Sequence, residues 1–348
     1  MTPDAAPVLT AVDGHAARIT LNRPRALNSL TRPMLDGVAD ALDAWEHDPG
    51  VRTVVLDGAG ERGLCAGADI RLFHDAARSG DHTAAEAFLR AEYRLDSRIA
   101  HYPKPYVALM DGIVMGGGVG LSAHGSVRVV TERSRVAMPE VSIGLVPDVG
   151  GTFLLSRAPG HLGTHLALTG LSAGPADAVL CGLADHFVPA AALPDLVADL
   201  AREPAHDAVA RHARPVPEGV LAGERAWIDA CYDADTVEEI VDRLFSCGEP
   251  AAKDAAETLL AKSPSAVKAT LESLRRAARL DSLEAALDQE FRVTCAALDT
   301  HDLPEGIRAQ IIDKDRDPHW DPATLAEVDA ARVERYFAPR GERELGLA

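Results

Sequence analysis

Two carboxylates, Glu140 and Asp148, stand eight residues apart in the mostly apolar segment MPEVSIGLVPDVGG. Carboxylates in apolar surroundings can act as general acids, general bases or nucleophiles, because burial changes how tightly they hold a proton. Upstream, the glycines Gly116, Gly117 and Gly118 precede a predicted short helix. Glycines let backbone N–H groups approach a ligand closely. Hydrogen-bond donors and a carboxylate are together the minimum needed for chemistry on a carbonyl group.

The segments around these residues alternate between strand and helix patterns. Residues 106–110 and 127–131 are predicted strands on either side of the glycine run, which opens a short helix ending at His124. Nearer the start, apolar residues at helical spacing predict a helix over 30–44, and VRTVVL at 51–56 predicts a buried strand. This alternation predicts a mixed α/β core that holds both the glycines and the carboxylates.

Beyond about residue 190 the strand patterns end and helical patterns take over. Three N-terminal capping signals stand out, at Asp235 or Thr236, at Ser263 before Pro264, and in the D-x-x-E pattern of Asp281 and Glu284. We therefore predict two parts, an α/β core over 1–195 that contains the active site and a helical region over 196–348 that packs on it.

The composition excludes several classes of partner. A formal net charge of −18 disfavours nucleic acids and anionic membranes. The longest apolar runs are shorter than the ~20 residues that a membrane span needs. The cysteines are scattered without a C-x-x-C pattern, so neither a metal site nor a disulfide framework is predicted. The first eight residues, MTPDAAPV, lack the features of signal and transit peptides, and we expect a cytoplasmic protein.

Several motifs together resemble the crotonase (enoyl-CoA hydratase/isomerase) superfamily. These are LNRPRALNSL, CAGADI, MGGGVGLSAHG and the segment that carries the two carboxylates. The acidic pair with PDVGG, and IDKDRDPHW near the end, are most similar to the 3-hydroxyisobutyryl-CoA hydrolases. The resemblance implies a spiral of ββα units and a homo-oligomer. It also implies no separate cofactor and no metal, since coenzyme A is part of the acyl-CoA substrate.

The resemblance also implies roles for individual residues. The backbone amides of Ala66 and Gly117 would bind the thioester oxygen, and Glu140 and Asp148 would act on the substrate, with Glu92 and Gly117 as further substrate contacts. The residues implied in coenzyme A binding are Arg25, Leu27, Ala66, Ala68, Asp69 and Ile70. Local arginines and amides would have to bind the coenzyme A phosphates, because the net charge of the chain is unfavourable for a polyanion.

One departure from the family pattern bears on the reaction. Hydratases of the superfamily carry a second carboxylate two residues after the glycine run, where this chain has Gly120. We therefore predict hydrolysis of a short 3-hydroxyacyl-CoA, such as 3-hydroxyisobutyryl-CoA in valine catabolism. A hydratase or isomerase on the same fold is the alternative, and a non-catalytic CoA-binding protein is a third. Whether Glu140 attacks the thioester or activates water stays open.

Other chemistries lack their sequence patterns. Neither G-x-x-x-x-G-K-[ST] nor G-x-S-x-G occurs, which argues against a P-loop and against a serine nucleophile elbow. Cys65 has no neighbouring base, and we interpret it as a small packed thiol rather than a nucleophile. His124 is likewise interpreted as a packed or capping residue.

Overall fold

The computed structural model describes residues 6–348, which form two compact units that alternate along the chain. The sheet unit comprises Met1–Asp69, Ala91–Ala137 and Ala173–Gly219, and the helical unit comprises Ile70–Arg90, Met138–Ser172 and Val220–Ala348. The sequence predicted one boundary near residue 195. The observed division differs because two earlier segments, around residues 70–90 and 138–172, pack with the C-terminal helices.

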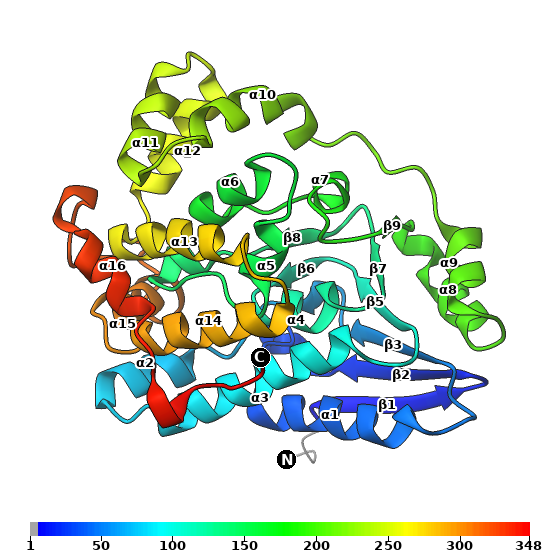
Figure 1. The fold of residues 1–348 in the computed structure, drawn as a ribbon. Helices are drawn as coiled ribbons and strands as arrows, with labels where there is room; N and C mark the ends of the chain where they lie inside the picture. The colour runs from blue at the N-terminus through cyan, green and yellow to red at the C-terminus, as the bar shows by residue number, and fades with distance from the viewer. Residues whose placement is uncertain (1–5) are drawn as a thin grey trace. The chain divides into compact units, whose positions relative to one another are not determined.

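The main element of the sheet unit is a six-stranded sheet in the order β1-β2-β3-β5-β7-β9 (Figure 1). Only β1 and β2 run antiparallel, and every later pair is parallel. The strands are β1 (Val8–Asp13), β2 (Ala16–Leu21), β3 (Thr53–Gly58), β5 (Tyr106–Met110), β7 (Val127–Val130) and β9 (His186–Phe187). The buried strand predicted at 106–110 is confirmed as β5.

A second, three-stranded parallel sheet has the order β4-β6-β8, with strands β4 (Gly63–Cys65), β6 (Ile113–Met115) and β8 (Arg135–Ala137). Its strands follow β3, β5 and β7 in the chain, so each successive pair contributes one strand to each sheet. This repetition is the predicted spiral of ββα units. The three-residue strands were not predicted, because they are too short to display an alternating pattern.

Helices cover the sheets of this unit. Apolar residues from the strands, including Val55, Val107 and Val129, form a buried cluster with Leu196 and Leu200 of α8. The helices and turns of the sheet unit are η1 (Pro24–Ala26), α1 (Arg32–Glu46), α4 (Gly117–Ala123), α7 (Pro175–Leu180), η3 (Ala190–Ala192), α8 (Leu193–Leu200) and α9 (Ala205–His212). The helix α3 (Thr83–Ala100) begins in the helical unit and ends in the sheet unit.

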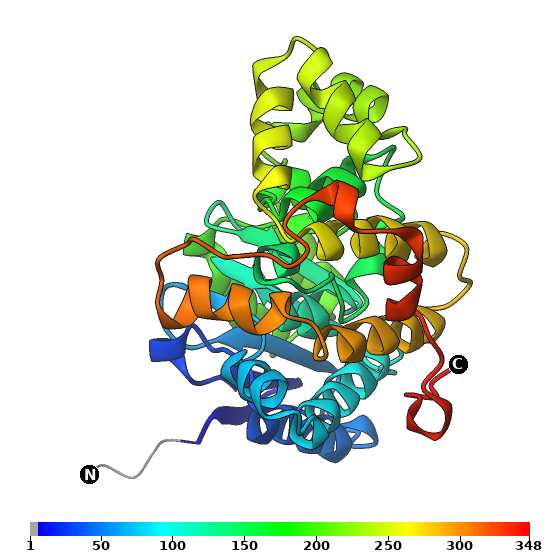
Figure 2. The ribbon, with the colours of Figure 1, turned by 90° about the vertical axis from the view of Figure 1, so that its left-hand side faces the viewer.

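The helical unit contains no strand among its described residues. Within it α10, α11 and α12 pack on one another, and α13 contacts α14 (Figure 2). Its elements are α2 (Arg71–Ser79), η2 (Glu140–Ile143), α5 (Gly151–Leu155), α6 (Leu162–Thr169), α10 (Leu221–Tyr232), α11 (Val237–Ser246), α12 (Pro250–Leu260), α13 (Pro264–Ala277), α14 (Leu283–Ala297), α15 (Asp302–Ile307), η4 (Arg308–Ile312), η5 (Leu325–Glu327), α16 (Ala330–Tyr336) and η6 (Gly341–Arg343).

The predicted capping residues can be compared with those observed. Thr236 and Ser263 cap α11 and α13, since their side chains accept hydrogen bonds from the backbone N–H groups three residues on. The cap of α14 is Ser282 rather than Asp281, because the Ser282 hydroxyl accepts the Ala285 N–H. The prediction was wrong there by one residue.

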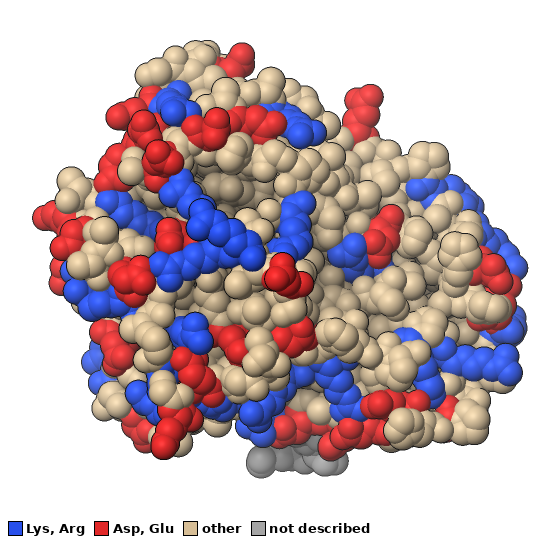
Figure 3. Space-filling model, in the orientation of Figure 1, with Lys and Arg blue, Asp and Glu red and all other residues tan. Residues whose placement is uncertain are grey.

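The surface of the described residues mixes charges of both signs. Figure 3 shows acidic and basic side chains interspersed on the face in view, without one continuous acidic field. Within residues 6–348, no helix combines the length and the apolar character needed to cross a membrane.

Candidate active site

The glycine run forms a tight turn between β6 and α4 in the sheet unit. Gly116 has φ 49° and ψ −122°, a conformation open essentially only to glycine. The N–H of Gly117 begins α4 and so has no partner within the helix. A Cβ on Gly118 would lie 2.6 Å from the carbonyl oxygen of Cys65, so α4 and the end of β4 approach to backbone contact. The glycines are therefore required by packing as well as by backbone conformation.

The structure changes the assignment of the second amide donor. The N–H of Ala66 donates to the carbonyl oxygen of Leu27 at 3.0 Å, so it is not available to a substrate as the sequence analysis predicted. Two residues on, Ala68 forms a parallel bridge with Leu30, and this bridge uses the N–H of Asp69 rather than that of Ala68. No backbone hydrogen bond of the Ala68 N–H is found within residues 6–348.

The turn at residues 66–68 and the glycine turn at residues 116–118 lie against each other. A Cβ on Gly67, which has φ 96°, would lie 3.6 Å from the backbone nitrogen of Gly117 and 3.2 Å from the carbonyl oxygen of Met115. Because Gly67 directly precedes Ala68, the amides of Ala68 and Gly117 belong to neighbouring turns. The structure thus brings together two amides that neither a helix nor a sheet uses.

Glu92 lies beside this turn. It is 1% exposed on α3, and a Cβ on Gly117 would lie only 2.3 Å from its Oε1. The same Cβ would lie 2.9 Å from Cδ1 of Leu30. The predicted substrate contact Glu92 is therefore next to one predicted donor, and any side chain at position 117 would displace it.

Cys65 is a buried thiol at the end of β4. Burial is the main cause that raises its pKa to about 12, and the Glu92 carboxylate adds to the effect, against a hydrogen bond from Gly67 and the charge of Arg23. A thiol with this pKa carries almost no thiolate near neutral pH. The geometry therefore supports the interpretation of Cys65 as a packed residue.

The residues predicted to bind coenzyme A lie on several elements. Arg25 is exposed on η1, and Leu27 directly after it has φ 53°. Asp69 forms an ion pair with Arg23 at 3.2 Å, a partner that the sequence analysis missed. Ala66 and Ala68 stand in the turn described above, whereas Ile70 belongs to the helical unit as the N-cap of α2.

In the helical unit, Glu140 begins η2 and is 6% exposed. Its carbonyl oxygen accepts the N–H groups of Gly144 and Leu145, which closes the turn around it. A Cβ on Gly144 would lie 2.5 Å from the Asp302 carbonyl group, and one on Gly306 would lie 2.5 Å from the backbone of Ile143. Glycines on both sides thus allow backbone contact between η2 and α15.

Asp148, 7% exposed, stands in a turn that leads into α5. The next two residues, Val149 and Gly150, have φ values of 52° and 78°. A positive φ is unusual for a β-branched residue and has to be stabilised by the surrounding structure. The Asp148 carbonyl oxygen accepts the Gly151 N–H at 2.6 Å.

The group that stabilises this turn is Glu290 on α14, which the sequence analysis did not identify. Its carboxyl group, 1% exposed, accepts the N–H of Gly150 at 2.6 Å and that of Thr152 at 2.9 Å, as well as the Thr152 hydroxyl. Burial raises the pKa of Glu290 to about 8, and the Asp148 charge contributes, while the three donors lower it. A signal was present, because Glu290 falls on the apolar helical stripe of Leu283 and Leu287.

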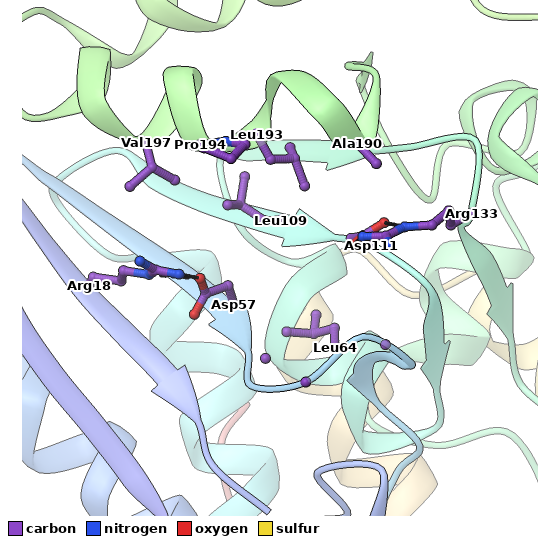
Figure 4. A pocket seen from close by; sticks show the side chains of 13 residues that line it. Arg18, Asp57, Leu64, Leu109, Asp111, Arg133, Ala190, Leu193, Pro194 and Val197 are labelled. Carbon is purple, nitrogen blue, oxygen red and sulfur yellow. Dashed lines mark hydrogen bonds and ion pairs between the residues drawn. The ribbon is translucent and has the colours of Figure 1, made fainter. Parts of the chain in front are cut away.

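A separate cavity of about 510 Å³ lies in the sheet unit, shown in Figure 4. Two ion pairs line it, Arg18 with Asp57 and Arg133 with Asp111, together with apolar side chains such as Leu109. The residues predicted for the active site are not among its lining. Since each aspartate in it is already paired with an arginine, this cavity offers no unpaired charge from those four residues.

Within residues 6–348, no three His, Cys, Asp or Glu side chains are arranged to hold a metal ion. The described residues of the sheet unit present amide donors beside the buried Glu92, and those of the helical unit present the buried carboxylates Glu140, Asp148 and Glu290.

The chain is similar to known proteins over most of its length. A family model described as enoyl-CoA hydratase/isomerase matches residues 16–337. The protein of Gallus gallus named "3-hydroxyisobutyryl-CoA hydrolase, mitochondrial" is 42% identical over 357 residues, covering 99% of this chain and 92% of the relative. The Homo sapiens protein of the same name is 39% identical over 355 residues, with the same coverage. The predicted resemblance is confirmed.

Two solved structures are also similar. A carnitinyl-CoA dehydratase from Mycobacterium thermoresistibile has a TM-score of 0.95 and 52% identity, covering 99% of both chains. An enoyl-CoA hydratase from Rhodobacter sphaeroides 2.4.1 has a TM-score of 0.92 and 46% identity, covering 97% of this chain and 99% of the other. The predicted fold class is confirmed.

One prediction is contradicted by the comparison. The sequence analysis expected a cytoplasmic protein, whereas the vertebrate relatives, at 39–42% identity, are named as mitochondrial proteins. The absence of transit-peptide features in the first eight residues was therefore not a sound basis for that expectation.

Proposed function

Because this chain belongs to the enoyl-CoA hydratase/isomerase family, we propose that it hydrolyses a short 3-hydroxyacyl-CoA, most favourably 3-hydroxyisobutyryl-CoA. The products would be 3-hydroxyisobutyrate and coenzyme A, a step of valine catabolism. Relatives named for this hydrolysis align over nearly the whole chain. The observation that carries the proposal is the pair of buried carboxylates at 140 and 148, with glycine at 120.

The sheet unit would supply the donors for the thioester oxygen. We assign these to the amides of Gly117 and Ala68, in place of Ala66, whose N–H is bonded to Leu27. A preorganised donor typically stabilises an oxyanion by about 3 kcal/mol. Glu92, next to Gly117, would contact the bound substrate.

The helical unit would supply the carboxylates. Glu140 either attacks the thioester carbon, giving a mixed anhydride that water then cleaves, or takes a proton from the attacking water. Asp148 would accept a hydrogen bond from the 3-hydroxyl group of the acyl chain. This contact would favour 3-hydroxyacyl substrates, because a hydrogen bond to a charged acceptor is lost when the acyl chain carries no hydroxyl group.

The test is thiol release from 3-hydroxyisobutyryl-CoA. Glu140→Gln keeps the shape of the side chain but removes its acid–base and nucleophilic capacity, so kcat should fall by at least ~10². Glu257→Gln, on the exposed face of α12, is the matched control and should leave kcat unchanged. Near-normal turnover by Glu140→Gln would refute the assignment.

A single turnover in ¹⁸O-labelled water tests the route through a mixed anhydride. If Glu140 attacks and water then cleaves the mixed anhydride at the Glu140 carbonyl carbon, one labelled oxygen enters its carboxylate, and mass spectrometry of the peptide that contains it detects the label. An unlabelled peptide would exclude hydrolysis of an anhydride at the Glu140 carbon.

Hydration of an enoyl-CoA is the alternative, and the two similar structures named as a dehydratase and a hydratase favour considering it. Gly120 argues against it, because hydration uses two opposed carboxylates and this position lacks one. Loss of ultraviolet absorbance from an enoyl-CoA without thiol release would favour hydration. A chain that binds coenzyme A but turns over no acyl-CoA would favour a non-catalytic role.

Binding of the coenzyme A portion and subunit assembly complete the proposal. Arg25, exposed and without an ion pair among the described residues, would bind a phosphate group, while Leu27, Asp69 and Ile70 would flank it. Arg25→Ala should then raise KM for the acyl-CoA. The homo-oligomer expected from the family remains a prediction, which analytical ultracentrifugation tests directly.

A further inference from the structure

Glu290 has an unusual environment for a carboxyl group. It is 1% exposed in the middle of α14, and its three donors come from only two residues, Gly150 and Thr152. Both residues stand at the start of α5, two and four residues after Asp148. The carboxyl group of one helix thus caps the first turn of another.

The segment that it caps is one that would not hold its shape alone. Val149 and Gly150 both have positive φ values, and the side chain of Val149 is 1% exposed. The Gly151 N–H donates to the carbonyl oxygen of Asp148, so Asp148 belongs to the same hydrogen-bonded turn. Any change in how Gly150 and Thr152 are held would therefore rotate or shift Asp148.

We propose that Glu290 is a positioning residue that fixes the turn at residues 148–152, and so orients Asp148 toward the 3-hydroxyl group of the substrate. This inference rests on the proposed function, in which Asp148 recognises that hydroxyl group. Small displacements matter at such a site, since a shift of about 1 Å caused by a distant residue can cost about 10²-fold in rate.

The electrostatics agree with this role. Burial and the nearby Asp148 charge raise the pKa of Glu290, while Gly150 and Thr152 lower it through their hydrogen bonds. A carboxyl group that holds its proton more tightly than usual repels the Asp148 carboxylate less. Glu290 can therefore lie close to Asp148 without driving it away.

The experiment compares two thioesters, 3-hydroxyisobutyryl-CoA and isobutyryl-CoA, which differ by the hydroxyl group alone. The discrimination ratio is kcat/KM for the first divided by kcat/KM for the second. Asp148→Asn sets the loss of discrimination expected when the contact is removed. Glu290→Gln places an amide NH₂ group against the donors of the turn, and it should lower the ratio by about 10-fold or more.

The double variant Asp148→Asn with Glu290→Gln tests whether the two residues act together. If Glu290 works through Asp148, the ratio in the double variant should be within about twofold of that in Asp148→Asn alone. Multiplication of the two losses would overturn the proposal, because it would mean that Glu290 acts independently.

A matched control separates positioning from general stability. Gln289 is the neighbouring buried residue on α14, and its amide donates to the Ser273 carbonyl oxygen at 3.1 Å. Gln289→Leu should lower the urea midpoint without changing the discrimination ratio. If Gln289→Leu lowered the ratio as much as Glu290→Gln, the effect would be a general loss of packing and the proposal would fail.

Amide hydrogen exchange gives a measurement that does not depend on any substrate. In Glu290→Gln the peptide covering residues 148–155 should exchange at least about tenfold faster than in the wild type, and in Gln289→Leu it should not. Unchanged exchange there would refute the proposal even if the activity fell.

A second variant and the wild-type activity complete the test. Thr152→Val removes only the hydroxyl donor and keeps the side-chain shape, so it should show a smaller loss in the same direction, and it carries the test if Glu290→Gln does not fold. Wild-type enzyme that hydrolyses neither thioester would refute the proposed function, whereas wild-type discrimination retained in Glu290→Gln would refute the inference alone.

Discussion

The two segments proposed to act on the substrate are held in different ways. In the sheet unit, the turn at Gly116–Gly118 is held by backbone packing, with Gly118 against the Cys65 backbone and Gly117 against Glu92. In the helical unit, the turn that carries Asp148 is held by one carboxyl group, Glu290, 140 residues away in the sequence. Rigidity in the first comes from the lack of side chains, and in the second from a buried polar contact.

The difference predicts different responses to substitution. A turn held by backbone contact tolerates no added atom, because the neighbouring backbone cannot move out of the way. A turn held by a polar contact tolerates atoms of the same shape but is sensitive to the loss of an acceptor. Each of the following tests addresses one side of this comparison.

Gly118→Ala should have the largest effect. The new methyl group would lie 2.6 Å from the Cys65 carbonyl oxygen and 2.9 Å from its Cβ, so the turn would have to open. We expect a loss of about 2–3 kcal/mol in the free energy of unfolding, measured in urea, and a loss of activity of about 10²-fold. Gly223→Ala on α10, where a Cβ meets no atom within 4 Å, is the control and should be neutral or stabilising. Equal stability of the two variants would contradict the packing argument.

A second test addresses the buried titratable groups of the helical unit. Burial lowers the pKa of His165 on α6 to about 4, against 6.5 as the ordinary value. The folded state therefore holds His165 neutral, and stability present above pH 6.5 is lost as the pH falls toward 4. Between pH 7 and pH 5 we expect a loss of about 2 kcal/mol that is absent in His165→Gln, measured by urea unfolding.

Glu290 should change the stability with pH in the direction opposite to His165. Its pKa is raised to about 8, so the folded state gains stability from it as the pH falls from 8 toward 4.5. Glu290→Gln should consequently steepen the loss of stability on acidification, whereas His165→Gln should flatten it. Identical pH profiles for the two variants would show that neither group is buried as described.

The smallest effect is expected at Cys65. With its pKa raised to about 12 by burial, this thiol should not react with iodoacetamide at pH 8 in the folded protein. Mass spectrometry of the peptide carrying Cys65 after native labelling measures this, and labelling in urea shows that the peptide can be detected. Rapid native alkylation would mean that the turn beside it opens frequently.

The sequence predicted the sheet unit better than the helical unit, and the reason is the range of the interactions. Strand β5, the glycine turn and helix α1 can each be predicted from about a dozen consecutive residues, through their apolar periodicity or their glycines. The hydrogen bond from Ala66 to Leu27 was not predictable, because it depends on how two distant loops pack.

The same limit explains the missed residue in the helical unit. The only sequence signal of Glu290 is its position as a charged residue on an apolar helical stripe. The neighbouring sequence does not indicate that its partners are Gly150 and Thr152. The close approach of Gly306 to the Ile143 backbone likewise has no local signal in the sequence. Local patterns thus identified which residues matter, and tertiary contacts decided which atoms are available.

The separation between Asp148 and Glu290 has a consequence for synthesis on the ribosome. All segments of the sheet unit have been translated once Gly219 is added. Glu290, which caps the turn that carries Asp148, is translated 140 residues after its partner Gly150. At about 5–20 residues per second, that interval is about 7 to 28 s. During that time the nascent chain can complete its sheets while the turn that carries Asp148 has no cap, so competence for the reaction should arise only after Glu290 has been translated.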